Sequence, residues 1–530
     1  MSIQSAGPGV RRAELGDMPP EELRRLAHEV VDWIADYLGR VGDLPVLPDV
    51  SPGEIRDALP SKAPVAGESM DDVLADFRET VLPGVTHWNH PTFHGYFAVT
   101  GSGPGILGEM ITAALNVNAM VWRSSPAGTE LEVLTLDWLR DLLGLPGGFT
   151  GVIQDGASTS SLVALAAARE IGLPEARALG LSAAPRARIY ASEEAHSSIA
   201  KASVTLGLGR EGLRRVRADE RFRMDVEALR AAVAEDVASG IRPIAVVATV
   251  GTTSTASVDP VGAIADVAKE HGLWLHVDAA YAGAAAIVPE LRPLFQGWER
   301  ADSIVLNPHK WLFTPVDCSA LLMRRPEAVR AAFSLVPEYL RTAEGDRATH
   351  LMDYGVALGR RFRALKLWFV MRYFGRDGIV SRIREHVRLA RWLADQIDED
   401  PAWERAAPVD FSTVVFRWAP EGVPGRVQDE VTEAVLTSVN ESGKAFVSHT
   451  KLNGRFWIRL SVGNLGTTQA HMERTWALIR EAAERIVIEP VHSSREGWGE
   501  AAHRIRERGE DGLLDPPAST DFDESEWRWE

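Results

Sequence analysis

Lysine is scarce in this sequence of 530 residues, and one lysine stands where an amine could react as a nucleophile. Only seven of the 57 basic residues are lysines, so arginine serves wherever charge alone is needed. Lys310 follows the apolar run Ile304–Leu306 and directly precedes Trp311. Desolvation among apolar groups favours a neutral amine, which can attack a carbonyl group and form a Schiff base. Taken alone, the pattern favours an ordinary strand-end lysine in a surface ion pair.

The other six lysines show no comparable setting. We expect three of them in loop-like segments and three on solvated helix faces. The loop set is Lys62, Lys444 and Lys451, and the helix set is Lys201, Lys269 and Lys366.

An aspartate, Asp278, ends a second apolar run, Leu273–Val277. A carboxylate at the end of a buried strand is costly unless a cation pairs with it. A lysine for the aldehyde and an aspartate for the pyridinium nitrogen are the two fixed requirements of pyridoxal phosphate. The third requirement is a phosphate site, and Asp155–Ser161 offers small residues, hydroxyls and free N–H groups before the helical run Leu162–Glu170. An ordinary Ser/Thr N-cap would also explain that stretch, but the three features together predict a pyridoxal phosphate site.

Apolar strands that alternate with helices must position these groups. Between about residues 150 and 320 the runs Ile244–Val250, Leu273–Val277 and Ile304–Leu306 alternate with a helical pattern at Val261–His271. This alternation predicts an α/β core with a mainly parallel sheet covered on both faces. Ligands bind at the carboxyl ends of such strands. The polar residues expected there are Thr252, Thr253, Asp278, Asn307, His309 and Lys310.

The chain divides into five expected segments. Residues 1–18 are expected to be disordered, 19–100 to be a helical segment, 101–395 to form the large domain, 396–487 to form a small α+β domain, and 488–530 to be a disordered acidic tail. The apolar stripe between Leu23 and Leu38 cannot be buried by one helix alone, so it requires a larger body or a partner subunit.

Composition excludes several classes of function. The net charge of −17 argues against binding to nucleic acids or to an anionic membrane surface. No apolar run is long enough to span a membrane, and the N-terminus lacks the apolar core of a secretory signal. One cysteine, Cys318, cannot form an internal disulfide, a zinc cluster or an iron–sulfur site, so we expect no metal and a reducing compartment, the cytoplasm. The Gly103–Gly108 match to a dinucleotide-binding pattern follows no strand and is not expected to bind nucleotides.

The sequence resembles the group II pyridoxal-phosphate decarboxylases, and among them the decarboxylases of aromatic amino acids. The resemblance extends from about Pro19 to Val487. Its motifs are Val-Thr-His-Trp at 85–88, Ser-Ser-Pro-Ala-Gly-Thr-Glu-Leu-Glu at 124–132, Gly-Val-Ile-Gln at 151–154, Ala-His-Ser-Ser at 195–198, His-Val-Asp-Ala-Ala-Tyr-Ala-Gly at 276–283, Asn-Pro-His-Lys-Trp at 307–311 and Leu-Gly-Arg-Arg-Phe-Arg at 358–363.

The resemblance implies a fold, an assembly and roles for individual residues. The fold would be the aminotransferase-like fold type I, in an obligate homodimer with a shared active site, in which residues 19–100 wrap the partner subunit. Lys310 would hold pyridoxal 5′-phosphate as an aldimine, Asp278 would keep the ring nitrogen protonated, and His196 would stack on the ring. The phosphate contacts would be Ala157, Ser158 and His309, the residues near the ring Thr253 and Asn307, and the substrate pocket Trp88, Tyr96, Phe97, Val99 and Met120.

The implied reaction is decarboxylation of an aromatic L-amino acid (tryptophan, tyrosine, phenylalanine or dihydroxyphenylalanine) to an arylalkylamine and carbon dioxide through a quinonoid intermediate. Tyr339 would return a proton to the substrate carbon; relatives with Phe at this place release an aldehyde instead. Val99, Asn118 and Met120 depart from the animal enzymes, which favours an indole or phenyl ring over a catechol. The alternatives are an aromatic aldehyde synthase, a decarboxylase of a non-aromatic amino acid, and a non-catalytic scaffold.

Overall fold

A seven-stranded sheet forms the centre of the molecule, in the computed structural model that describes residues 16–97, 99–335 and 348–488. The strand order is β1-β7-β6-β5-β4-β2-β3, with parallel pairing except where β7 runs antiparallel to β1 and β6. The strands are β1 (Thr150–Gln154), β2 (Ala187–Ser192), β3 (Leu213–Val216), β4 (Arg242–Thr249), β5 (Trp274–Asp278), β6 (Ser303–Leu306) and β7 (Ser319–Met323). The predicted mainly parallel α/β sheet is confirmed.

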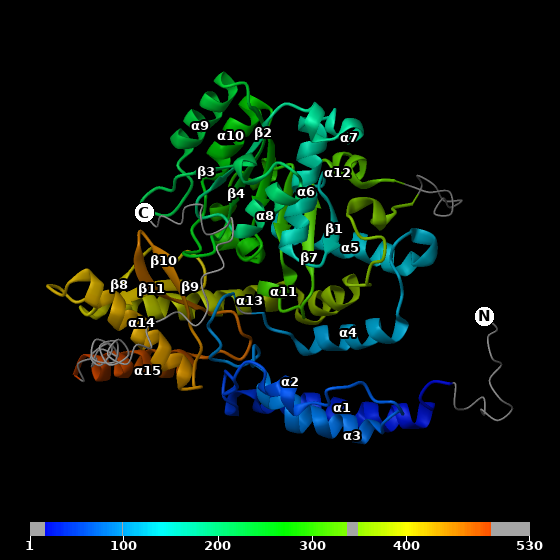
Figure 1. Cartoon of the computed structure of the whole chain (residues 1–530), viewed down its shortest axis with the longest axis vertical. Helices are drawn as coiled ribbons and strands as arrows, with labels where there is room; N and C mark the ends of the chain where they lie inside the picture. The colour runs from blue at the N-terminus through cyan, green and yellow to red at the C-terminus, as the bar shows by residue number, and fades with distance from the viewer. Residues whose placement is uncertain (1–15, 98, 336–347, 489–530) are drawn as a thin grey trace, which may run out of the picture.

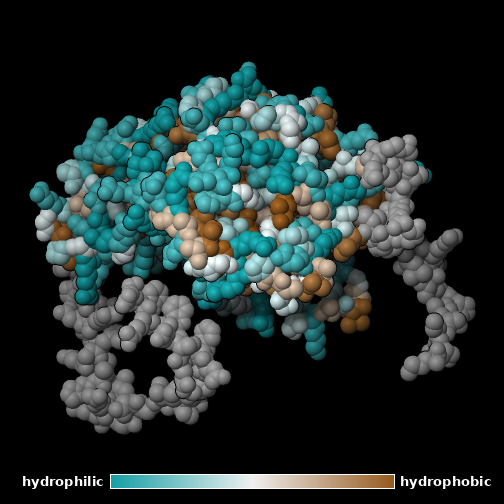
Figure 2. Space-filling view, turned by 90° about the horizontal axis from the view of Figure 1, so that it is seen from above, coloured by the Kyte–Doolittle hydropathy of each residue, from teal (hydrophilic) through white to brown (hydrophobic). Residues whose placement is uncertain are grey.

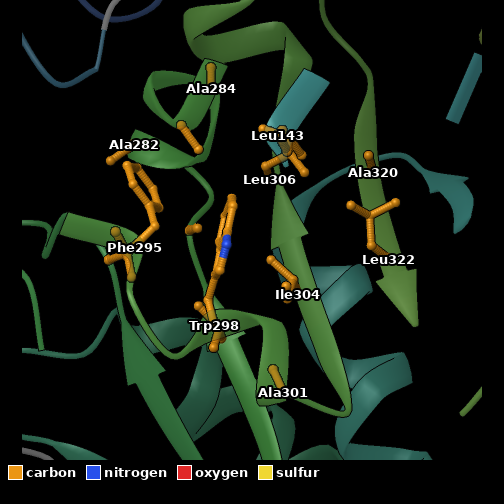
Figure 3. Packing of buried hydrophobic residues seen from close by; sticks show 14 of the residues in the cluster. Leu143, Ala282, Ala284, Phe295, Trp298, Ala301, Ile304, Leu306, Ala320 and Leu322 are labelled. Carbon is orange, nitrogen blue, oxygen red and sulfur yellow. The ribbon is translucent and has the colours of Figure 1, made fainter. Parts of the chain in front are cut away.

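Helices cover both faces of this sheet (Figure 1). Because side chains alternate along a strand, Val246 and Ala248 of β4 belong to one apolar cluster, while Ala245 and Val247 belong to the other. The helices of the large domain are α5 (Pro126–Leu143), α6 (Ala157–Gly172), α7 (Ala176–Leu179), α8 (Ser197–Thr205), α9 (Val226–Ala238), α10 (Val261–His271), α11 (Pro308–Trp311) and α12 (Pro326–Phe333). Figure 3 shows the face toward α5, where Ile304 and Leu306 of β6 pack beside Trp298. A core this tightly filled holds the strand ends in fixed positions.

The N-terminal segment forms a separate helical arm below the large domain in Figure 1. It contains α1 (Pro20–Arg40), α2 (Glu54–Ala58) and α3 (Met70–Asp76). The ion pairs Arg25–Asp71 (3.0 Å) and Arg78–Glu29 (2.5 Å) join α1 to α3 and to the turn that follows it. Leu26 is the buried residue of α1, whereas Leu23 and Val31 are exposed. The apolar stripe that the sequence predicted is therefore only partly covered in the single chain.

A smaller antiparallel sheet lies beyond the large domain. Its order is β10-β11-β9-β8, and its strands are β8 (Trp403–Arg405), β9 (Thr413–Trp418), β10 (Ser448–Leu452) and β11 (Arg455–Ser461). Helices α14 (Gly425–Glu441) and α15 (Gln469–Ile488) pack on it. Helix α13 (Ala364–Glu399) connects the two sheets and is interrupted at Gly375, whose φ of 61° is left-handed. The predicted α+β C-terminal unit is confirmed.

One expectation meets a different outcome in this region. Lys366, expected on a solvated helix face, is only 1% exposed and pairs with Glu109 at 2.8 Å. The reason is that α4 (Gly103–Leu115) packs closely on α13. The Gly103–Gly108 pattern forms the first turns of α4.

The ends of the chain and one internal segment cannot be compared with the expectations. Residues 1–15, nearly the whole acidic tail, and Tyr339 lie outside the described residues. Among the helices that the structure does describe, none combines the length and the apolar character needed to cross a bilayer. The face seen in Figure 2 is mostly hydrophilic, with scattered hydrophobic spots.

Candidate active site

A cavity of about 710 Å³ opens at the carboxyl ends of β4, β5 and β6, between the large sheet and the small one. This is where ligands bind in sheets of this kind. Twelve of the residues that the sequence singled out line it: Trp88, Tyr96, Phe97, Val99, Ala157, Ser158, His196, Thr253, Asp278, Asn307, His309 and Lys310.

Lys310 lies in α11, one short turn beyond the end of β6. Burial lowers the pKa of its amine to about 8; the negative charge of Asp278 opposes this shift, and the positive charge of Arg459 adds a smaller lowering. A lysine whose pKa is close to neutral carries a substantial fraction of free amine at physiological pH. The side chain is therefore suited to attack an aldehyde.

Asp278 is the last residue of β5 and is buried. One carboxylate oxygen accepts a hydrogen bond from the backbone N–H of Ala280 at 3.1 Å. Within the described part of the chain no cation lies within ion-pair distance of this buried carboxylate, and a buried charge without a partner is unfavourable. Two neighbouring buried oxygens, Asn307 Oδ1 and Thr249 Oγ1, also find no hydrogen-bond partner there. These unsatisfied groups around one cavity fit a polar, cationic ligand such as the pyridinium ring of pyridoxal phosphate.

Two histidines present the same tautomer to the cavity. The backbone N–H of Ser198 donates to Nδ1 of His196 (3.2 Å), and the backbone N–H of Cys318 donates to Nδ1 of His309 (2.9 Å). A backbone N–H can only donate, so each neutral ring carries its proton on Nε2. Burial lowers the pKa of His309 to about 4 and also lowers the pKa of His196. Both rings are therefore neutral Nε2–H donors near pH 7.

The first turn of α6 forms the third element of the site. The helix begins at Ala157, five residues before the expected start at Leu162, and its N-cap Gly156 provides no side-chain cap. The reading of this stretch as an ordinary Ser/Thr N-cap is therefore wrong. The free N–H groups of an uncapped first turn attract anions. Gly156, Ala157 and Ser158 line the cavity, so this turn can hold a phosphate.

Aromatic side chains form one wall of the cavity. Trp88 stacks on Tyr96 with 5.8 Å between ring centroids, and Phe97 stacks on Tyr281 at 3.9 Å. Trp88 is 37% exposed, so it is not a residue of the hydrophobic core. Such a wall suits a flat apolar ring.

Met120 is not placed on this cavity. Its backbone carbonyl accepts a hydrogen bond from the N–H of Met352 at 3.0 Å, and its side chain packs with Val121 and Met352. This contact holds the segment away from the aromatic wall in the single chain.

Sequence reasoning missed Arg459, a buried cation in the cavity wall. The residue lies in β11 and is 4% exposed. Its Nε donates to the carbonyl of Thr253 (2.9 Å) and its Nη1 donates to the carbonyl of Tyr96. Burial lowers its pKa to about 10. An arginine inside the otherwise apolar run Phe456–Leu460 indicates a buried cation, but the sequence does not show that it reaches this cavity.

Comparison with known proteins agrees with this geometry. Residues 52–419 match the model of the pyridoxal-dependent decarboxylase conserved domain. A tryptophan decarboxylase of Camptotheca acuminata is 39% identical over 481 residues, covering 89% of this chain and 96% of that protein. A tyrosine decarboxylase of Narcissus pseudonarcissus is 41% identical, covering 88% of this chain and 95% of that protein. A phenylacetaldehyde synthase of Arabidopsis thaliana is 39% identical, covering 89% and 98%.

Solved structures agree as well. The crystal structure of Oryza sativa TDC with PLP and tryptamine superposes with a TM-score of 0.86 at 37% identity, covering 89% of this chain and 99% of that one. The fold is the one called type I among pyridoxal-phosphate enzymes, and the residues around the cavity fit that cofactor. The family model, the relatives and the site together show that the chain belongs to the pyridoxal-dependent decarboxylases.

Proposed function

We propose that this protein decarboxylates an aromatic L-amino acid, of the tryptophan, tyrosine, phenylalanine or dihydroxyphenylalanine type, to the arylalkylamine and carbon dioxide. The observation that carries the proposal is that Lys310 and Asp278 share one cavity with the aromatic wall of Trp88, Tyr96 and Phe97. The relatives named for tryptophan and tyrosine decarboxylation support the substrate class.

Different residues around the cavity bind different parts of the cofactor in this proposal. Lys310 holds the aldehyde end, and Asp278 keeps a proton on the ring nitrogen. His196 stacks beside the ring, with Thr253 and Asn307 near it. Ala157, Ser158 and His309 hold the phosphate through N–H groups. When bound, pyridoxal phosphate withdraws the electrons of the bond between Cα and the carboxylate.

The substrate ring lies against the aromatic wall in this proposal. Trp88, Tyr96 and Phe97 contribute apolar surface, and Val99 adds an apolar side chain without a hydroxyl. Because Val99 itself offers a catechol hydroxyl no hydrogen-bond partner, we expect an indole or phenyl ring to be favoured over a catechol. Tyr339, outside the described residues, would return a proton to the carbon that loses carbon dioxide.

A second candidate is an aromatic aldehyde synthase, favoured by the 39% identity to a phenylacetaldehyde synthase. The tyrosine at position 339 speaks for the amine product, because a hydroxyl is needed there to protonate the substrate carbon. Decarboxylation of a non-aromatic amino acid is a third possibility and would leave the aromatic wall without a role.

The assembly we propose is a cytoplasmic homodimer with a shared active site. Exposed apolar side chains on α1 and α4 support it, because a stripe of this kind is normally covered by a partner. They are Leu23, Val31, Leu107, Met110, Ile111 and Leu115. The lone buried Cys318 suits a reducing compartment.

One experiment tests the function. Purified protein is supplied with pyridoxal phosphate and a panel of aromatic and acidic amino acids, and products are identified by mass. Amine and carbon dioxide from an aromatic substrate are the expected result. Aldehyde with oxygen uptake and hydrogen peroxide would assign the synthase instead, and no product from any aromatic amino acid would contradict the proposal. Lys310→Ala is the control and should give neither product nor a yellow protein.

A further inference from the structure

Two cations contact the same aromatic ring in the cavity. The guanidinium carbon of Arg459 lies 4.3 Å from the ring centroid of Phe97, and Nζ of Lys310 lies 5.0 Å from it, so the two charges are within about 9 Å of each other. Phe97 is itself held by stacking on Tyr281, whose ring stacks in turn on Trp311 at 5.0 Å. The distance between the two cations is therefore fixed by a rigid aromatic stack.

Arg459 keeps its full charge despite its burial. Its two hydrogen bonds go to the backbone carbonyls of Thr253 and Tyr96, and its Nη2 has no acceptor in the described part of the chain. Neutral carbonyls orient the guanidinium without cancelling its charge. An arginine held in this way keeps a charge that can act on other groups in the cavity, by an amount that depends on the effective dielectric constant between them.

The groups that are electrostatically coupled to Lys310 come from four elements, and Tyr96, Tyr281 and His449 line the same cavity. Asp278 at the end of β5 attracts a proton to the amine, and Arg459 on β11 repels it. His196 at the start of α8 and His309 in α11 are neutral imidazoles, as their hydrogen bonds require. Arg459 therefore opposes the effect of Asp278 on the pKa of Lys310.

We propose that Arg459 is a positioning residue that holds part of Lys310 in the free amine form near neutral pH, and so speeds the capture of the cofactor aldehyde. In that capture the amine nitrogen forms a bond to the aldehyde carbon, and the aldehyde oxygen leaves as water with both amine hydrogens, without any redox change. The inference rests on the proposed role of Lys310 as the cofactor lysine.

The test measures the rate of cofactor capture against pH. Full-length protein is stripped of cofactor, pyridoxal phosphate is added, and covalent capture is followed by absorbance and by borohydride trapping with mass spectrometry of the Lys310 peptide. Arg459→Gln removes the charge and keeps an N–H donor for the carbonyls, whereas Arg459→Lys keeps the charge. Arg417→Met is the matched control, since Arg417 is also buried and lies over a ring, Trp457 at 4.7 Å, but has carboxylate partners outside the cavity.

Removal of a unit charge about 9 Å away should raise the midpoint of the capture profile by roughly 0.3 to 1.3 pH units, for effective dielectric constants between 80 and 20. The capture rate at pH 7 should then fall by about two- to twentyfold. Arg459→Lys and Arg417→Met should keep the wild-type midpoint.

Three results would overturn the inference. The first is an unchanged midpoint in Arg459→Gln, even if the KM for the amino acid rises, because Arg459 would then serve the substrate alone. The second is an equal shift in Arg459→Gln and Arg459→Lys, because geometry and not charge would then be responsible. The third is an equal shift in Arg417→Met. If Arg459→Gln does not fold, Arg459→Met measures the same loss of charge. Covalent capture by Lys310→Ala would contradict the proposed function itself. It would be detected separately, as a trapped peptide that does not contain residue 310.

Discussion

Arg360 and Glu132 form a buried ion pair, with 2.8 Å between Arg360 Nη2 and Glu132 Oε1. Both also bind the backbone of Ile153 in β1: Glu132 accepts from its N–H at 2.8 Å, and Arg360 donates to its carbonyl at 2.6 Å. Strand β1 leads directly into the turn before α6, whose first N–H groups line the cavity. The pair thus joins three distant segments behind the first turn of α6.

Arg360→Met should destabilise the protein by about 3–5 kcal/mol, because it leaves Glu132 buried without a partner. The free energy of unfolding in urea measures the loss. Arg361→Met is the matched control: Arg361 pairs with Glu109 at the surface, where an ion pair contributes at most about 1 kcal/mol. Equal losses of unfolding free energy in the two variants would show that the buried pair stabilises the protein no more than the surface pair does.

The positions of Lys310 and Asp278 could be predicted from the sequence because each depends on local pattern. A polar residue that ends an apolar run of the sheet must lie at the carboxyl edge, whatever the rest of the chain does. The start of α6 could not be predicted in the same way. Ser160 and Ser161 disfavour a helix interior, but burial and hydrogen bonds to Ser319 and His276 overcome that preference.

Arg459, Lys366 and Met120 illustrate what local pattern cannot supply. Arg459 reaches the cavity because β11 approaches from the small domain, and Lys366 is buried because α4 packs on α13. Met120 is held by Met352, more than two hundred residues further along the chain. Each placement is decided by a contact between segments that lie far apart in the sequence, and no periodicity or spacing records such a contact.

Asp278→Asn should shift the capture of pyridoxal phosphate in the direction opposite to Arg459→Gln. Asp278 raises the pKa of Lys310, so its removal favours the free amine, and the capture midpoint should move to lower pH. Carbon dioxide release should nevertheless fall by roughly 10²–10⁴, because a neutral amide does not hold the proton on the ring nitrogen. Stopped-flow capture against pH and a carbon dioxide assay give the two readings.

Asp302→Asn is the control for that variant. Asp302 is also buried at an end of the same sheet, where it accepts from the N–H of Leu275 at 2.9 Å and pairs with Arg324. It does not line the cavity, so its substitution should leave the capture midpoint unchanged. A midpoint that rises in Asp278→Asn would contradict the charge balance argued for Lys310.

His386 should make the protein lose stability as the medium becomes acidic. Its Nδ1 accepts from Trp311 Nε1 at 3.0 Å, its Nε2 lies 3.1 Å from the carbonyl of Asn464, and burial lowers its pKa to about 4. Between pH 6.5 and 4 the unfolded chain binds a proton at this residue and the folded chain does not, so stability falls as pH falls. The contribution amounts to about 3 kcal/mol over that window.

His386→Gln should therefore flatten the dependence of unfolding free energy on pH between 7 and 4.5, although it lowers stability at pH 7 through the lost hydrogen bonds. Urea unfolding at several pH values measures the slope. His28→Gln, on an exposed position of α1, should leave the slope as in the wild type. An unaltered slope in His386→Gln would assign the acid sensitivity to other groups.

Tyr339→Phe should keep the bound cofactor and lose the amine product. The phenol is the proposed donor of the proton that replaces carbon dioxide, and removal of a positioned acid slows that step by roughly 10²–10⁴. Carbon dioxide release should continue with oxygen uptake, and aldehyde should replace amine, since the substrate carbon then reacts with oxygen. The ratio of amine to aldehyde by mass spectrometry, together with hydrogen peroxide, gives the result. Tyr373→Phe, a change at an exposed tyrosine of α13, is the control and should leave the ratio unaltered. Unchanged amine output from Tyr339→Phe would remove Tyr339 from the reaction and reopen the choice between decarboxylase and aldehyde synthase on other residues.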